Sequence, residues 1–185
     1  MRPALQTLFG VNYQTDRAVF QCTSRYAKKG KQGYKVGQEY RPVYSAQDKK
    51  TYNTGLLEST FALVPHGDGR WNYRFSEVIG AGSIPVVLSD GLTLPFAQII
   101  DWSKAAIVLP EKVIDDLNKN GGGVDGLLSL LPSKVETRAM LAEVQRIHST
   151  YFATPAKREA ALMASAYVEA FCRRAGANSS RYACG

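Results

Sequence analysis

The chain has 185 residues, of which 45% are hydrophobic, and a formal net charge of +7; this length supports one globular core and not two full domains. Its three cysteines, Cys22, Cys172 and Cys184, are odd in number and show no CxxC or Cys/His spacing, which excludes a disulfide framework and a zinc site. No run approaches the roughly 20 apolar residues that span a bilayer, and the first apolar stretch is too short for a signal peptide, so we expect a soluble chain without a targeting segment.

Residues 1–50 carry the whole charge excess. They contain ten Lys and Arg against three Asp and Glu, whereas residues 51–185 contain thirteen of each kind. Turn-forming residues are frequent in this quarter, and we expect loops with one or two short strands, such as residues 17–24. Basic residues mixed with tyrosines can form a surface for nucleic acid or another polyanion. A solvated, poorly ordered arm is the simpler interpretation of the same pattern.

The organised part of the chain is predicted to begin near Tyr52. A short apolar run at residues 60–64 stops at a proline and predicts a buried strand. Asn72 is a plausible N-cap for a helix that follows. The apolar face of that helix, at the i, i+3, i+4 spacing, consists of Phe75, Val78 and Ile79.

Two further strands are expected after this helix. Gly80 and Gly82 are predicted to end the helix, and residues 84–88 are too apolar and β-branched for a surface strand. The order strand, helix, strand predicts a right-handed βαβ unit and hence a parallel sheet. Residues 95–100 predict a short helix and residues 105–109 a third strand of the same sheet.

From Glu111 onward the pattern is helical. Ser133 and Glu136 form a capping box, and the helix behind it has an apolar stripe of Met140, Val144, Ile147 and Tyr151. Thr154 and Pro155 open a last helix, with Ala160, Met163, Tyr167 and Phe171 on one side. We expect the helices after Ser133 to pack outside the sheet.

The loop between the first strand and its helix is the candidate site. In an open parallel sheet, ligands bind beyond the carboxyl ends of the strands, where helix amino termini favour anions. Two glycines in this loop let a ligand approach the backbone, arginines can pair with phosphate oxygens, and Glu77, three residues after Arg74, is placed to accept from ribose hydroxyls. The candidate residues for binding such a nucleotide are Gly67, Asp68, Gly69, Arg70, Asn72, Arg74 and Glu77. A tight turn and an exposed Arg74–Glu77 ion pair are the alternative interpretations.

Other chemistry is less well supported by the sequence. The loop matches neither the dinucleotide fingerprint G-x-G-x-x-G nor the phosphate-binding loop with its G-K-[ST] ending. His66 and Asp68 could each act as a catalytic base, but hydrogen bonding within the loop explains them equally well. The catalytic residue therefore stays unassigned. His148 flanks a helix stripe and is not expected to be a ligand. Without a D-x-D pair or a His/carboxylate cluster, we expect no protein-bound metal and no cofactor.

Residues 59–111 contain, in order, the runs FALVPHG, RFSEVIGAGSIPVVLS and LPFAQIIDWS. They resemble the exostosin family of glycosyltransferases, whose members carry F-C-L-x-P-R-G, R-F-x-E-A-x-x-A-G-x-I-P-V-x-L-S and L-P-F-x-x-x-I-D-W-S. The resemblance extends from Tyr52 to Phe152. His66 departs from it by standing where the family has Arg, and Asn72 by standing where a small Ser is frequent.

The resemblance implies a two-lobed GT-B enzyme whose C-terminal lobe binds a nucleotide sugar, usually a UDP-sugar, and whose N-terminal lobe presents a glycan acceptor. Within it, Arg74 matches a diphosphate contact and Glu77 a ribose contact. The turn and strand behind the site match Gly82, Ile84 and Pro85. The D-W-S segment matches Asp101, Trp102 and Ser103, where Trp102 is more simply explained as a core residue than as a platform for sugar.

The predicted fold is thus α/β, with a Rossmann-like parallel sheet and flanking helices that resemble the C-terminal lobe of a GT-B glycosyltransferase, and with a reduced N-terminal part. We expect residues 1–50 to be a basic, partly irregular remnant of an N-terminal lobe, residues 51–175 to be the donor-binding domain and residues 176–185 to be a tail. Only about 50 residues are then left for an acceptor lobe.

The predicted function is a glycosyltransferase (hexosyl- or pentosyltransferase) of exostosin type, with this chain supplying mainly the donor lobe. The expected partners are a nucleotide sugar and a glycan acceptor, with no nucleic acid, and membrane attachment only through an upstream anchor. The resemblance implies the Golgi or secretory pathway. A non-catalytic glycan- or polyanion-binding protein on a degenerate transferase scaffold is the alternative. A dinucleotide oxidoreductase fits the βαβ order but lacks the glycine fingerprint.

Overall fold

The computed structural model describes residues 2–10, 12–21, 33–36, 39–42, 46–66 and 73–175. The chain forms two compact units. Unit 1 consists of Met1–Ser59 with Lys112–Ser129, and unit 2 consists of Thr60–Glu111 with Leu130–Gly185. The basic N-terminal quarter therefore forms one unit together with a segment from the middle of the chain, and the predicted sheet belongs to the other unit.

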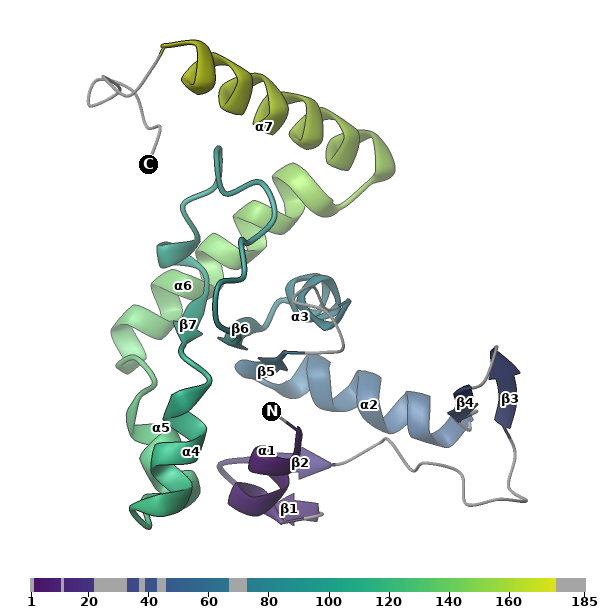
Figure 1. The fold of residues 1–185 in the computed structure, drawn as a ribbon, viewed down its shortest axis with the longest axis vertical. Coiled ribbons are helices and arrows are strands. Elements are labelled where there is room, and N and C mark those ends of the chain that lie inside the picture. The colour runs from purple at the N-terminus through teal and green to yellow at the C-terminus, as the bar shows by residue number, and fades with distance from the viewer. Residues whose placement is uncertain are drawn as a thin grey trace. The chain divides into compact units, whose positions relative to one another are not determined.

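Unit 1 contains, in its described residues, two antiparallel hairpins and four helices (Figure 1). The hairpins pair β1 (Asn12–Gln14) with β2 (Val19–Gln21) and β3 (Gly33–Val36) with β4 (Glu39–Pro42). The helices are α1 (Arg2–Phe9), α2 (Ala46–Glu58), α4 (Lys112–Lys119) and α5 (Gly123–Ser129). Strand β2 confirms the strand predicted within residues 17–24, of which residues 22–24 lie outside the described stretches.

The core of unit 1 joins the start of the chain to α4 and α5. Its buried apolar side chains are Leu5, Phe9, Ile114, Val124 and Leu127. The Asn118 side-chain amide donates to the Ala4 carbonyl at 2.9 Å, and the Phe9 ring stacks on Phe20 with centroids 4.8 Å apart. Helix α1 was not among the predicted elements, although its buried Leu5 and Phe9 have the i, i+4 spacing of a helix face.

Unit 2 is built on a parallel sheet of three strands in the order β5-β6-β7 (Figure 1). These are β5 (Phe61–Pro65), β6 (Ile84–Leu88) and β7 (Ile107–Leu109). All five residues of β6 are buried, as expected for the middle strand of a parallel sheet. The prediction of three parallel neighbours is confirmed, with the third strand starting two residues later than expected because Ala105 and Ala106 belong to the preceding turn.

Helix α3 (Arg74–Ala81) connects β5 to β6 and buries Phe75, Val78 and Ile79, as predicted. Its N-cap position falls on Tyr73, whose side chain makes no capping hydrogen bond, and Asn72 lies outside the described residues. The helix ends at Gly82, whose φ of 81° is left-handed and therefore suits a glycine. Gly80 is inside the helix, so the prediction that it helps to end α3 is wrong.

The helix predicted at residues 95–100 is wrong, because this segment forms turns. Phe96 has a φ of 55°, which breaks any helical path. Its carbonyl accepts from the amides of both Ile99 and Ile100 at 2.9 Å, and the Trp102 indole donates to the Pro95 carbonyl at 2.7 Å. A 3-10 turn, η1 (Trp102–Lys104), follows instead.

The remaining helices of unit 2 are α6 (Lys134–Ile147), the π-helical turn η2 (His148–Phe152) and α7 (Pro155–Ala175). The capping box of Ser133 and Glu136 is confirmed. In the predicted stripe of α6, Val144 and Ile147 are buried, while Met140 and Tyr151, the latter in η2, are half-buried. Helix α6 contacts β6 and η1.

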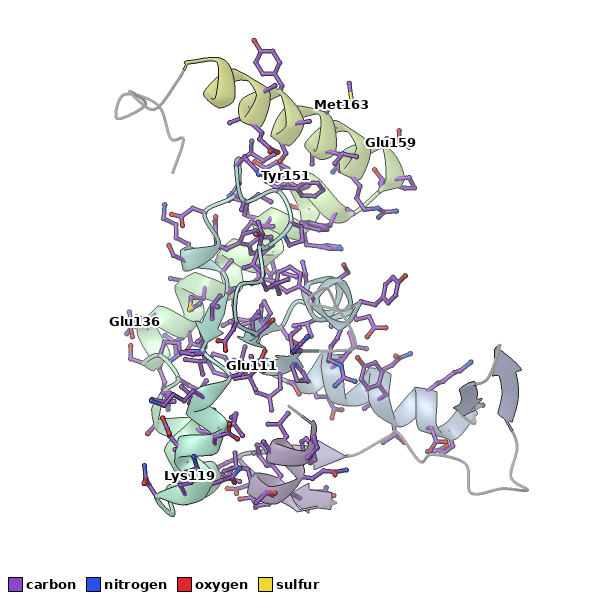
Figure 2. The ribbon with its side chains drawn as sticks, in the orientation of Figure 1. Glu111, Lys119, Glu136, Tyr151, Glu159 and Met163 are labelled. Atoms are coloured by element: carbon purple, nitrogen blue, oxygen red, sulfur yellow. The ribbon has the colours of Figure 1, made fainter. Side chains whose placement is uncertain are left out.

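Helix α7 starts at Pro155, as predicted, but its packing face differs from the predicted apolar side. Met163 and Tyr167 are each 73% exposed, and Figure 2 shows Met163 pointing away from the helix. The buried positions are the small residues Ala161 and Ser165, and the Ser165 hydroxyl lies 2.6 Å from the Gln98 side-chain oxygen. This hydrogen bond connects the buried side of α7 to the 95–100 segment.

Candidate functional site

The carboxyl ends of the three parallel strands meet at one edge of the sheet in unit 2. His66 follows β5 directly, Ser89 and Asp90 follow β6, and Glu111 comes two residues after β7. The His66 amide donates to the Leu88 carbonyl at 2.9 Å, which continues the pairing of β5 and β6 by one residue. In parallel α/β sheets this edge is where ligands bind.

Three polar side chains connect the strand ends to one another. The Asp90 amide donates to Glu111 Oε1 at 3.3 Å, and the Glu111 amide donates to Asp90 Oδ1 at 3.2 Å. Glu111 Oε1 also lies 3.2 Å from His66 Nδ1. Figure 2 marks Glu111 near this end of β7. The reciprocal Asp90–Glu111 pair satisfies two backbone amides and fixes the segments after β6 and β7 against each other.

Arg74 and Glu77 lie in the first turn of α3, the helix that starts from this edge. Arg74 is half-buried and Glu77 is exposed. Phe75, Val78 and Ile79 of the same helix are buried, and the i, i+3 spacing of Arg74 and Glu77 makes them neighbours on the helix surface, as predicted. A carboxylate in the first turn also interacts favourably with the helix dipole.

The structure thus describes two of the seven predicted donor-binding residues, Arg74 and Glu77. The other five, Gly67, Asp68, Gly69, Arg70 and Asn72, lie outside the described residues, and their roles stay predictions. His66 and Tyr73 border this gap on either side. His66 contacts Glu111, and Tyr73 is 82% exposed at the start of α3.

The D-W-S segment supports the site from within the core. Trp102 is 6% exposed, and its ring lies edge-on to Phe75 of α3, with centroids 5.0 Å apart, and to Phe152, at 6.2 Å. Asp101 accepts from the Ser103 hydroxyl at 2.6 Å and from the Ser103 amide at 3.2 Å. These hydrogen bonds, together with Lys104, hold the pKa of Asp101 below its usual value. Trp102 is a core residue, as its simpler interpretation predicted.

Ser89, Asp90 and Glu111 were not among the predicted site residues. The signal in the sequence was their position, since they are the first polar residues after the apolar runs 84–88 and 107–109. Among the described residues, no group of three or more His, Cys, Asp and Glu side chains is arranged to hold a metal ion. No helix in the described part of the chain is long and apolar enough to cross a membrane.

Comparison with known proteins shows the family to which the chain belongs. The family model of the Exostosin GT47 domain matches residues 8–120, which is more than half of the chain. The match includes β5, α3, β6 and β7, and it also reaches into the basic N-terminal quarter. The chain therefore belongs to the exostosin family of glycosyltransferases, as the three sequence runs predicted.

Curated relatives match a shorter segment. The chain is 46% identical over 65 residues to the Exostosin-1 homolog of Caenorhabditis elegans, a match that covers 35% of this chain and 17% of the relative. It is 43% identical over 67 residues to Exostosin-1b of Danio rerio, and 46% identical over 67 residues to Exostosin-1 of Drosophila melanogaster, covering 36% of this chain and 9% of the relative in each case. The chain thus spans less than a fifth of the length of these relatives.

Proposed function

We propose that this chain binds the nucleotide-sugar donor of an exostosin-type glycosyltransferase, and that the donor is a UDP-sugar. Membership of the exostosin family supports the reaction class. The observation that carries the site is the position of Arg74 and Glu77 in the first turn of a helix at the carboxyl edge of a parallel sheet. In this proposal unit 2 corresponds to the C-terminal lobe of a GT-B enzyme.

Arg74 and Glu77 have complementary roles in this proposal. The Arg74 guanidinium pairs with diphosphate oxygens and compensates the charge that develops on the departing nucleoside diphosphate. The Glu77 carboxylate accepts hydrogen bonds from the ribose hydroxyls. The amino end of α3 adds partial positive charge on the side of the phosphates. Gly67, Asp68, Gly69, Arg70 and Asn72 complete the proposed donor site.

The acceptor is proposed to be a glycan and the cellular location the Golgi or secretory pathway, in keeping with the family. No step is assigned to a metal or a further cofactor. The hydroxyl of the acceptor needs a general base, and we assign none to this chain. The proposed contribution of unit 2 is therefore binding and orientation of the donor.

The proposal is tested by calorimetric titration of UDP into the parent chain and into Glu77→Ala. Hydrogen bonds to a charged group contribute about 1.5–3 kcal/mol, so we expect Glu77→Ala to bind UDP roughly ten- to a hundredfold more weakly. Glu159→Ala is the matched control, because Glu159 is an exposed glutamate on α7 (Figure 2). Equal UDP affinity of the parent and Glu77→Ala would refute the role of Glu77, and absence of UDP binding to the parent would refute the proposed function.

A further inference from the structure

Ser89 carries a polar atom that the fold does not use. It is the first residue after the central strand β6 and is 4% exposed. Its hydroxyl oxygen is buried and has no hydrogen-bond partner among the described residues. In that part of the chain, no other buried side-chain oxygen or nitrogen lacks a partner. A buried hydroxyl without a partner costs free energy that an alanine would not. A hydrogen bond to a bound ligand would explain why such a hydroxyl is present.

Asp90 follows Ser89 in the chain and is paired with Glu111, and the side chains of both are acceptors of hydrogen bonds. Asp90 is exposed and Glu111 is half-buried. The contacts between the described residues use Oδ1 of Asp90 and Oε1 of Glu111, which leaves Oδ2 and Oε2 as further acceptors. Because each backbone amide of the pair binds the other side chain, both carboxylates are held in place before any ligand arrives.

The charge of this cluster indicates the class of ligand. Two carboxylates beside Ser89 disfavour a phosphate group, because like charges at short distance repel. The two carboxylates favour a neutral molecule with several hydroxyl groups. A hydroxyl can donate to a carboxylate, and it can donate to or accept from the serine hydroxyl. Arg74, in contrast, offers a positive charge for phosphate at the start of α3.

On the basis of the proposed function, we propose that Ser89, Asp90 and Glu111 form the subsite for the sugar of the nucleotide sugar. The hydroxyl groups of the sugar ring hydrogen-bond with Ser89 Oγ and donate to the remaining oxygens of Asp90 and Glu111. Arg74 and Glu77 hold the nucleotide, and the ends of β6 and β7 hold the group to be transferred. The subsite is thus a determinant of sugar specificity.

The experiment measures the affinities of the parent chain and of Ser89→Ala for UDP and for a panel of UDP-linked sugars: glucose, galactose, glucuronic acid, xylose and N-acetylglucosamine. Loss of one neutral hydrogen bond should weaken binding of the preferred UDP-sugar by roughly two- to tenfold and leave UDP affinity unchanged. Ser83→Ala is the matched control, because Ser83 is an equally buried serine just before β6, at the opposite end of the same strand. This control should keep the affinities of the parent for UDP and for every sugar.

Thermal unfolding without ligand gives a second readout. Because the Ser89 hydroxyl has no partner among the described residues, Ser89→Ala should unfold at a temperature no lower than the parent. A clear fall in the midpoint would show that the hydroxyl already has a structural partner, which would overturn the subsite.

The binding outcomes separate this inference from the proposed function. If the parent binds UDP and Ser89→Ala binds every UDP-sugar as the parent does, the sugar subsite is wrong and the donor site stands. If Ser89→Ala loses UDP and UDP-sugar affinity equally, the hydroxyl contacts the nucleotide and the assignment to the sugar is wrong. If the parent binds neither UDP nor any UDP-sugar, the proposed function fails and the subsite fails with it.

Discussion

At the scale of single residues, Trp102 of the D-W-S segment is buried in the core behind helix α3. Its indole lies between Phe75, on the buried face of α3, and Phe152 in η2. Its N–H donates to the Pro95 carbonyl at 2.7 Å and so fixes the left-handed turn at Phe96. The residue links the helix that carries Arg74 and Glu77 to the segment that follows Ser89 and Asp90.

We expect Trp102→Phe to lower the free energy of unfolding by about 1–3 kcal/mol, because it removes one hydrogen bond and part of a well-packed ring. UDP affinity should change little, since Trp102 is buried and phenylalanine keeps an aromatic ring at this position. Urea unfolding and UDP titration on the same sample check both statements. A loss of UDP affinity at unchanged stability would show that Trp102 contacts the ligand.

At the scale of elements, helix α6 depends on its capping box. Ser133 Oγ accepts from the Glu136 amide at 3.4 Å, and the Glu136 carboxylate accepts from the Ser133 amide at 2.9 Å and from its hydroxyl at 2.7 Å. We expect Ser133→Ala to lower the free energy of unfolding by about 1 kcal/mol, the usual effect of losing a serine N-cap. Ser129→Ala, in unit 1, is a control for general effects of removing an exposed serine.

The capping box of α6 also leads us to expect that the free energy of unfolding depends on pH. Hydrogen bonds from the Ser133 hydroxyl and amide hold the pKa of Glu136 below its usual value of 4.5. A carboxyl group whose pKa is lower in the folded state stabilises the fold above its unfolded pKa, and this contribution disappears as the pH falls through the folded pKa. Glu136→Gln keeps the capping geometry but cannot ionise. The stability difference between the parent and Glu136→Gln should therefore be present at pH 7 and shrink below about pH 4.5.

Urea unfolding of both proteins from pH 7 to pH 4 measures this difference. A difference that stays constant over the range would mean that the charge of Glu136 makes no contribution to the stability of α6.

At the scale of the whole molecule, the two units differ in what they can offer to a transferase reaction. Unit 2 has a parallel sheet with polar residues at its carboxyl edge. The described residues of unit 1 form two antiparallel hairpins and four helices and contain no second parallel sheet. An acceptor site that positions a hydroxyl and a base within hydrogen-bond reach requires a firmly packed scaffold, and such positioning supplies several kcal/mol of the barrier reduction.

We therefore expect this chain to bind the donor and to show little or no sugar transfer by itself. The measurement is incubation of the purified chain with labelled UDP-sugars and a panel of glycan acceptors, next to UDP titration of the same preparation. Robust transfer would show that unit 1, or the edge of unit 2, supplies the acceptor site and the base.

Local patterns in the sequence were sufficient for much of unit 2. Short apolar runs gave the three strands, the spacing of Phe75, Val78 and Ile79 gave the buried face of α3, and Ser133 with Glu136 gave the start of α6, because these features depend on neighbours along the chain. The position of Arg74 and Glu77 at the carboxyl edge followed from the strand–helix–strand order.

Contacts between distant segments were decided only by the tertiary structure. The Asp90–Glu111 pair, the burial of Ser89 and the turn at Phe96 depend on side chains and carbonyls that meet after the strands have paired. Helix α7 buries Ala161 and Ser165, and Ser165 donates to Gln98, a residue far away in the sequence, so the apolar stripe of the helix itself did not indicate this face. Likewise, α1 packs on α4 and α5 across more than a hundred residues of sequence, as the Asn118–Ala4 hydrogen bond shows. Hydrophobic periodicity identified the buried face of α3 but not that of α7. The packing partner of an element depends on the shape and polar groups of distant segments, which a local pattern does not contain.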